Sequence, residues 1–270
     1  MNAFANHFAF EFKSTLRNPT LLLMNYLFPL GFYAMMGLIM VQINPIFDEI
    51  LIPSLVLFAI MVGTILGLSS PLVESREAGI YRSFKINGVP AISILAIPTL
   101  STIFHTLIVS AIIALTGGPL FKGATPTDWL AFALVTLLAA LCMGALGALI
   151  GVVATSSRST LFLSQGIFLP SMLLGGLMMP LSILPESARY ISGLLPTTYA
   201  MQALEGLAYG RDTLIDPWLA VGILAACALI SAILAIYLFN WDSRNQSRRG
   251  HPLMGLIALL PFIVGILLGF

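Results

Sequence analysis

A compact charged island lies at residues 74–90, with the sequence ESREAGIYRSFKINGVP and five charged side chains. It separates two segments that are each long and apolar enough to cross a bilayer. Carboxylates and cations this close together can pair with charges on another protein, and a solvated loop is the alternative interpretation. The pattern indicates a short helix that ends near Gly88, before a membrane segment that starts at Pro90. We expect these charges to face a partner protein: Glu74, Arg76, Glu77, Arg82 and Lys85.

His105 is a titratable side chain in the middle of an apolar segment, residues 91–115. Ser101, Thr102 and Thr106 lie on the same stripe if the segment is a helix. We interpret this stripe as hydrogen bonding between helices, with a polar contact in a transport pathway as the alternative.

Three methionines near Gly175 and Gly176 could line a deformable apolar pathway: Met172, Met178 and Met179. Thioether side chains are flexible and polarizable, so they suit variable hydrophobic cargo. Contact with lipid is equally compatible with these positions. His105 and the three methionines are therefore the candidate pathway residues.

Enzymatic and metal chemistry find little support in the sequence. Cys142 and Cys227 fall inside apolar segments, which favours packing over a disulfide or a metal site. The HExxH motif is absent, and the apolar segments contain no Asp from which a catalytic pair could be assembled. The phosphate-binding motif G-x-x-x-x-G-K-[ST] is also absent, so an ATP-driven process would need a second polypeptide. We therefore expect that this chain is not an enzyme and that it binds no metal or cofactor itself.

The elements that must position these residues are membrane helices. Of the 270 residues, 59% are hydrophobic and 9% are charged, whereas a soluble domain keeps about a quarter of its residues charged. Strands of outer-membrane barrels alternate apolar and polar residues over about 10 residues, and the sequence lacks this pattern. It also contains no run of basic residues that would indicate nucleic acid binding. The sequence predicts an all-α membrane protein with a single transmembrane domain over residues 1–270. The predicted spans are 20–42, 50–72, 91–115, 129–153, 160–180 and 217–240, each close to the roughly 20 residues that a bilayer requires.

The basic residues are distributed unevenly between the two sides of this arrangement. One side receives nine of the 12 lysines and arginines, including those of the charged island. Because basic residues favour the cytoplasmic side, we expect the N-terminus, the island and residues 241–251 to lie in the cytoplasm. The protein is then a multi-pass protein of the cytoplasmic membrane of a bacterium or an archaeon.

Three segments outside the six spans have their own signals. In residues 1–18, large apolar side chains recur every four positions (Phe4, Phe8, Phe12 and Leu16), which predicts an amphipathic helix in the membrane interface. Residues 181–216 are proline-punctuated and apolar, so we predict two short outer helices that enter the membrane without crossing it, with a plain structural cap as the alternative. Residues 252–270 carry no charge and predict a seventh crossing, which Pro261 would kink.

Glycines at positions 144, 147 and 151 allow another backbone to approach the fourth predicted span closely. Gly147 and Gly151 form a G-x-x-x-G motif. We favour packing within the same chain, and dimerisation is the alternative.

The order of these features resembles the permease subunits of type-2 ABC transporters. The shared features are an amphipathic N-terminal helix, two spans, an island of the form E-x-R-E-x-G (Glu74, Arg76, Glu77 and Gly79), two more spans and a proline-bounded outer segment. The outer run LPESARYISGLLPTTYAMQALEGLAYG, residues 184–210, is similar to the segment before the last core helix of that family. The resemblance covers nearly residues 1–245 and fits the drug-resistance exporter branch best in size, whereas the apolar residues 252–270 depart from the six-helix plan.

This resemblance implies a six-helix ABC-2 type transmembrane domain within a dimeric exporter. Two permeases, identical or similar, would pair with two cytoplasmic ATPases that bind ATP and Mg. The island would act as the coupling helix, through Glu74, Arg76, Glu77, Gly79, Arg82 and Lys85. Membrane lipids would surround the permease, and a hydrophobic or amphipathic substrate (a drug, a lipid or a peptide) would move out across the membrane.

An ion-coupled secondary transporter is the competing class. Such transporters usually carry Asp or Glu inside their spans, where the carboxylate binds the coupling ion. The six predicted spans contain no carboxylate. The sequence therefore favours the ATP-driven class.

Overall fold

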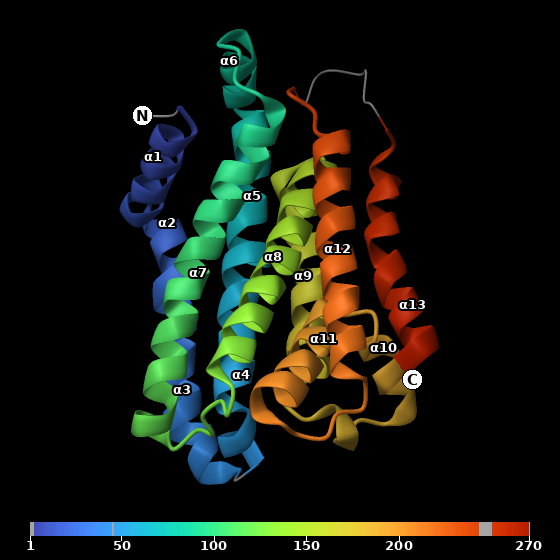
Figure 1. Ribbon diagram of the computed structural model, residues 1–270. Helices are drawn as coiled ribbons and strands as arrows, with labels where there is room; N and C mark the ends of the chain where they lie inside the picture. The colour runs from blue at the N-terminus through green and yellow to red at the C-terminus, as the bar shows by residue number, and fades with distance from the viewer. Residues whose placement is uncertain (1–2, 45, 243–249, 270) are drawn as a thin grey trace.

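The computed structural model describes residues 3–44, 46–242 and 250–269. In this part of the chain the protein is a bundle of helices that run roughly parallel or antiparallel to one another (Figure 1), with no strand. Six described helices are long and apolar enough to cross a membrane: Pro19–Ile43, Phe47–Glu77, Ala91–Phe121, Trp129–Val153, Pro217–Leu238 and Pro252–Gly269. The predicted all-α membrane fold is confirmed.

The N-terminal segment forms two helical parts that meet at Asn18. Helix α1 (Ala3–Arg17) is the amphipathic helix predicted for residues 1–18, and its location in the membrane interface stays a prediction. The Asn18 side chain accepts hydrogen bonds from the backbone N–H groups of Thr20 and Leu21, which caps the next helix and separates it from α1. The first apolar helix follows as α2 (Pro19–Leu22), a π-helical turn η1 (Leu23–Leu27) and α3 (Phe28–Ile43).

The second apolar helix forms the centre of the bundle. It comprises α4 (Ile46–Met61), the π-helical stretch η2 (Val62–Leu68) and α5 (Ser69–Glu77). Every residue from Ile50 to Ile65 is buried within the protein itself. A helix that is apolar all round is expected in such a central position. The chain continues with the short helix α6 (Ile80–Ile86). The long helices α7 (Ala91–Phe121) and α8 (Trp129–Val153) follow.

The predicted fifth span is shorter and more polar than expected. Helix α9 (Ser157–Leu174) has 18 residues, and its Ser156–Ser159 capping box marks its start. It is not among the six helices that length and composition qualify as spans. The predicted boundary at residue 180 is wrong, because the chain leaves the helix after Leu174 at the Gly175–Gly176 pair.

Short helices fill the end of the bundle that lies opposite α6 (Figure 1). Two short α-helices were predicted between residues 181 and 216, and α10 and α11 confirm them. The pieces are η3 (Leu181–Ile183), α10 (Glu186–Ser192), α11 (Pro196–Ala203) and the π-helical turn η4 (Leu204–Ala208). All eight residues of α11 are buried, so this segment is part of the bundle and not a solvated loop.

The C-terminal segment runs back along α12 (Pro217–Leu238) toward the end that holds α10 (Figure 1). It is built as a 3-10 helix η5 (Pro252–Leu259) followed by α13 (Leu260–Gly269). A 3-10 helix rises about 2.0 Å per residue and an α-helix about 1.5 Å, so these 18 residues extend about 31 Å, against about 27 Å for a pure α-helix. The 3-10 stretch thus makes a short segment long enough for a hydrocarbon core of about 30 Å.

The glycines of α8 pack against helices of the same chain, as favoured from the sequence. A Cβ added to Gly147 would lie 2.2 Å from the backbone oxygen of Thr64, and one added to Gly151 would lie 2.9 Å from the Cβ of Leu72. The Ser69 hydroxyl donates to the Gly147 carbonyl at 2.9 Å. The second apolar helix and α8 are therefore in close backbone contact where Thr64 and Ser69 meet Gly147 and Gly151.

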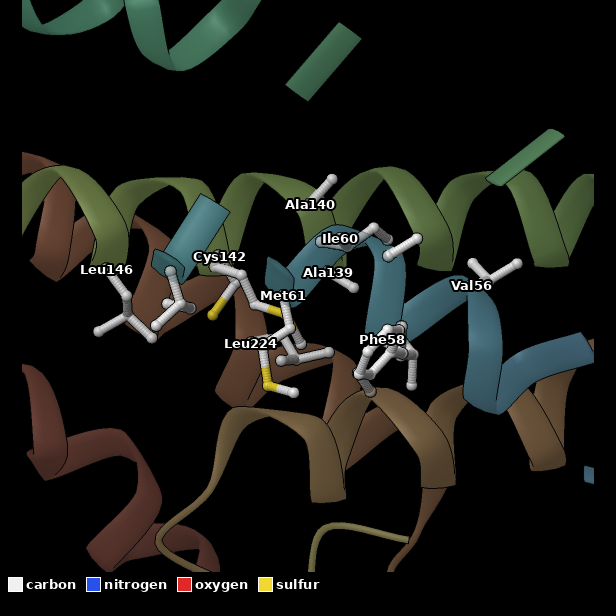
Figure 2. Close-up of a cluster of buried hydrophobic side chains, with 14 of the residues drawn as sticks. Val56, Phe58, Ile60, Met61, Ala139, Ala140, Cys142, Leu146 and Leu224 are labelled. Atoms are coloured by element: carbon white, nitrogen blue, oxygen red, sulfur yellow. The ribbon is translucent and has the colours of Figure 1, made fainter. Parts of the chain in front are cut away.

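A buried apolar cluster joins α4, α8 and α12 (Figure 2). Phe58, Met61, Leu146 and Leu224 are among the side chains that meet there. Cys142 belongs to this cluster as a free, fully buried thiol, in line with its predicted packing role.

Candidate coupling surface and transport pathway

Helix α6 projects beyond the other helices at one end of the bundle (Figure 1). Gly79 precedes it with φ +73° and Gly88 follows it with φ +74°, a backbone conformation that favours glycine at both ends. Tyr81 anchors the helix, because its ring is buried and lies 5.6 Å from the ring of Phe239 at the end of α12. The predicted short helix, its end near Gly88 and the new start at Pro90 are confirmed.

The outer surface of α6 combines charge with exposed apolar side chains. Arg82 and Lys85 are exposed, Ile80 is 47% exposed and Ile86 is 80% exposed. Exposed apolar side chains next to charged ones would suit contact with another protein. The structure thus adds two apolar residues to the predicted charged ones.

Two glutamates of the charged island do not lie on the short helix as predicted. Glu74 and Glu77 lie on the last turns of α5, and both are exposed. The Ser157 hydroxyl at the start of α9 donates to the Glu77 carboxylate at 2.9 Å. Glu77 therefore has a contact inside the chain as well as an exposed side.

Arg76 is not on the surface, which corrects the expectation that its charge faces a partner. Its side chain is buried, with 7% exposed. The guanidinium donates to the backbone carbonyls of Gly151 at 3.3 Å and Val152 at 2.8 Å, and it also donates to the carbonyl of Ala154. We call this set of hydrogen bonds the Arg76 clamp.

The Arg76 clamp satisfies the C-terminal end of α8. The last carbonyls of a helix have no partner within the helix, and the helix dipole makes that end negative. A cation with several donors in a planar fork meets both needs. The clamp thus fixes the base of the charged island to the turn between α8 and α9.

Arg82 forms an ion pair with Asp242, just after α12. This contact could not be predicted from the sequence, because the two residues are far apart in the chain and neither lies in a regular pattern. Arg82 is more than half exposed, so the pair contributes little stability. It does hold α6 beside the end of α12.

His105 is fully buried and held by two aromatic residues from the N-terminal segment. Its Nδ1 lies 2.6 Å from the hydroxyl of Tyr26, and its ring stacks on Phe12 with centroids 4.2 Å apart. Phe12 belongs to α1, so α1 packs directly on α7. The Tyr26 contact joins two helices as interpreted, but it does so for His105 alone, because the Thr106 hydroxyl donates to the Ile103 carbonyl within α7. A pathway role for His105 stays a prediction.

The structure does not bring the three methionines to His105. Met172 lies near the end of α9, and the other two follow in the turn after it. Met172 and Met178 are partly buried against the core, whereas Met179 is 40% exposed. Their place in a pathway stays a prediction.

An apolar groove of about 450 Å³ runs between α7, α8 and α12. Its walls include Leu95 on α7, Ala145 on α8 and Ala228 on α12. Small residues at 225, 228, 232 and 235 recur at helical spacing along α12, and their short side chains leave the space. This alanine spacing is the signal in the sequence from which the groove could be predicted.

These features define a class first: a multi-pass membrane protein whose helix bundle carries one projecting helix at an end. The family model described as ABC-2 type transporter matches residues 4–209, which is most of the chain. The chain therefore belongs to the ABC-2 family and is the membrane permease part of an ABC transporter. No curated protein and no solved structure gives a significant match to it.

Proposed function

We propose that this chain is the permease subunit of an ATP-driven exporter in the cytoplasmic membrane. The observation that carries the proposal is α6: a projecting helix with exposed Lys85 and Ile86, joined by a short turn to the central helix of a chain in the ABC-2 family. A cytoplasmic ATPase subunit is the partner that such a surface fits. ATP and Mg would be bound by that subunit, and the permease itself would make and break no covalent bond.

The Arg76 clamp supports a route for the coupling. ATP binding at the partner would favour one arrangement of two permease copies, and a displacement of α6 would reach α5 through a short turn. Arg76 connects α5 to the last carbonyls of α8, and Glu77 connects it to the start of α9. The central helix, α8 and α9 would then move as one unit against the rest of the bundle.

The chemistry of the bundle supports a hydrophobic or amphipathic cargo, such as a drug, a lipid or a peptide. The groove between α7, α8 and α12 presents alanine, leucine and isoleucine side chains and a single threonine, Thr99, whose hydroxyl donates to the Leu95 carbonyl. An ionic solute would lose its hydration there without gaining a partner.

An ion-coupled secondary transporter is the alternative. His105 is the mid-span titratable group on which such a mechanism would draw, and its ring is enclosed by Phe12 and Tyr26. This arrangement favours a packing role, which leaves the ATP-driven proposal ahead.

Charge reversal on α6 tests the proposed partner surface. We expect Lys85→Glu to reduce the amount of ATPase that co-purifies with the permease about tenfold, because a close interfacial charge pair is worth ~1.5 kcal/mol or more. Ile86→Asp should act in the same direction by placing a charge in the contact. Lys122→Glu is the matched control, since Lys122 is exposed at the opposite end of the bundle. Wild-type recovery of the ATPase with both α6 variants would mean that α6 is a solvated loop.

A further inference from the structure

A cleft of about 120 Å³ lies beneath α1, next to α6. Its walls come from five parts of the chain: α1, α2, the segment around the η2–α5 junction, α6 and α7. Glu11 of α1, Tyr81 and Phe84 of α6, and Thr102 of α7 all line it. The cleft differs from the apolar groove because polar and aromatic side chains share its lining.

Glu11 brings an unpartnered carboxylate to this cleft. The residue is half-buried, and the hydroxyl of Thr15 bonds to its backbone carbonyl, not to its carboxylate. Within the described residues the carboxylate has no hydrogen bond and no ion pair. Burial raises the pKa of Glu11 above its ordinary value, and the nearby His7 opposes this shift. A partly desolvated anion without a partner is stabilised by any cation that reaches it.

Aromatic rings complete the lining around this carboxylate. Phe84 is partly buried with its ring 6.0 Å from that of His7, and Phe10, which also lines the cleft, is 68% exposed. Aromatic faces attract cations, and quaternary ammonium groups are bound in proteins by such rings. A carboxylate beside several rings is therefore suited to an alkylammonium group.

We propose that this cleft binds the ammonium head group of an amphiphile whose apolar tail lies in the bilayer. The amphipathic α1 places the cleft at the depth of the lipid head groups, where such a molecule would be oriented with its charge toward water. Where the amphiphile is cargo, the inference rests on the proposed function. Tyr81 and Phe84 belong to α6, so an occupied cleft contacts the same helix that we assign to the ATPase.

The test uses the purified chain in nanodiscs of phosphatidylglycerol, a lipid without an ammonium group. The probe is a dodecyltrimethylammonium analogue with a diazirine beside the head group, and peptide mapping locates the crosslinks. We expect labelling in the peptides that carry Glu11 and Phe84. Glu11→Gln should weaken probe binding about tenfold, equivalent to ~1.4 kcal/mol, while Glu11→Asp retains the charge and part of the binding. Glu186→Gln, at the opposite end of the bundle, is the matched control for the loss of one carboxylate.

Two further measurements identify the source of the ligand and the results that would contradict the proposal. Added phosphatidylethanolamine that displaces the probe would assign the cleft to a bilayer lipid, whereas unchanged labelling would assign it to a free amphiphile. Equal labelling of wild type and Glu11→Gln, or equal labelling by an uncharged dodecyl probe, would overturn the ammonium site. The gel-filtration profile of each variant shows that it is folded. Because the assay contains neither ATP nor ATPase, its outcome is independent of the proposed energy source.

Discussion

Replacing Gly147 by alanine should destabilise the permease by about 1–3 kcal/mol, the range for overpacking a tight contact. The added Cβ would lie 2.2 Å from the oxygen and 3.0 Å from the carbonyl carbon of Thr64. Both are backbone atoms of the central helix, so no side-chain rotation relieves the clash. The two helices must separate, and the hydrogen bond from Ser69 to the Gly147 carbonyl would be weakened at the same time.

Gly222→Ala on α12 is the matched control for this prediction. A Cβ at Gly222 would meet no atom within 4 Å, and alanine is the better helix former by about 1 kcal/mol. Thermal unfolding of the purified chain in detergent should therefore show a lower midpoint for Gly147→Ala and an unchanged or higher one for Gly222→Ala. Equal midpoints would contradict the backbone contact between α8 and the central helix.

Arg76→Ala should be the most destabilising loss of a charge on the island, by about 3 kcal/mol or more. It removes the buried hydrogen bonds to the carbonyls of Gly151, Val152 and Ala154, and the end of α8 is left without partners. Arg76→Lys keeps the charge but replaces a fork of donors by one ammonium, so we expect an intermediate loss. Thermal unfolding of the purified variants measures this order.

Arg82→Ala provides the comparison for Arg76→Ala, because the same side chain is removed from a surface ion pair. Exposed pairs contribute about 0–1 kcal/mol, so Arg82→Ala should stay close to wild type. Equal stability of Arg76→Ala and Arg82→Ala would show that the clamp does not hold α8.

The Arg76 clamp also predicts weaker coupling between the permease and the ATPase in Arg76→Lys. The ATPase should still bind, but the transport substrate should stimulate ATP hydrolysis less than it does with the wild-type permease.

The sequence predicted the parts of this fold that follow from regular patterns. Apolar length placed every predicted span except 160–180, and the glycine and proline around residues 88–90 indicated the end of α6. The glycine spacing on α8 indicated a close backbone contact, and the same-chain partner was the favoured choice. Each of these signals lies within a short stretch of the chain, so the amino-acid sequence alone was sufficient to find it.

The contacts that the sequence did not reveal join residues distant in the chain. The direction of the Arg76 side chain depends on the carbonyl groups at the end of α8, the first of which belongs to Gly151, 75 residues later. The charges beside Arg76 in the sequence gave no sign of this. The stacking of Phe12 on His105 likewise depends on how α1 folds back on α7. The early end of α9 and the 3-10 start of the last segment reflect local backbone choices that hydropathy does not record.

Transport by the reconstituted permease tests the central claim most directly. Vesicles that contain the permease and its co-purified ATPase should take up a fluorescent lipophilic substrate when ATP is added outside. The ATP acts on those permeases whose ATPase side faces outward. Collapse of the proton gradient with an ionophore should leave the initial rate nearly unchanged. If the permease alone, without ATPase or ATP, moved the substrate in response to a proton gradient, the ion-coupled alternative would be right and the account of α6 as a coupling helix would be wrong.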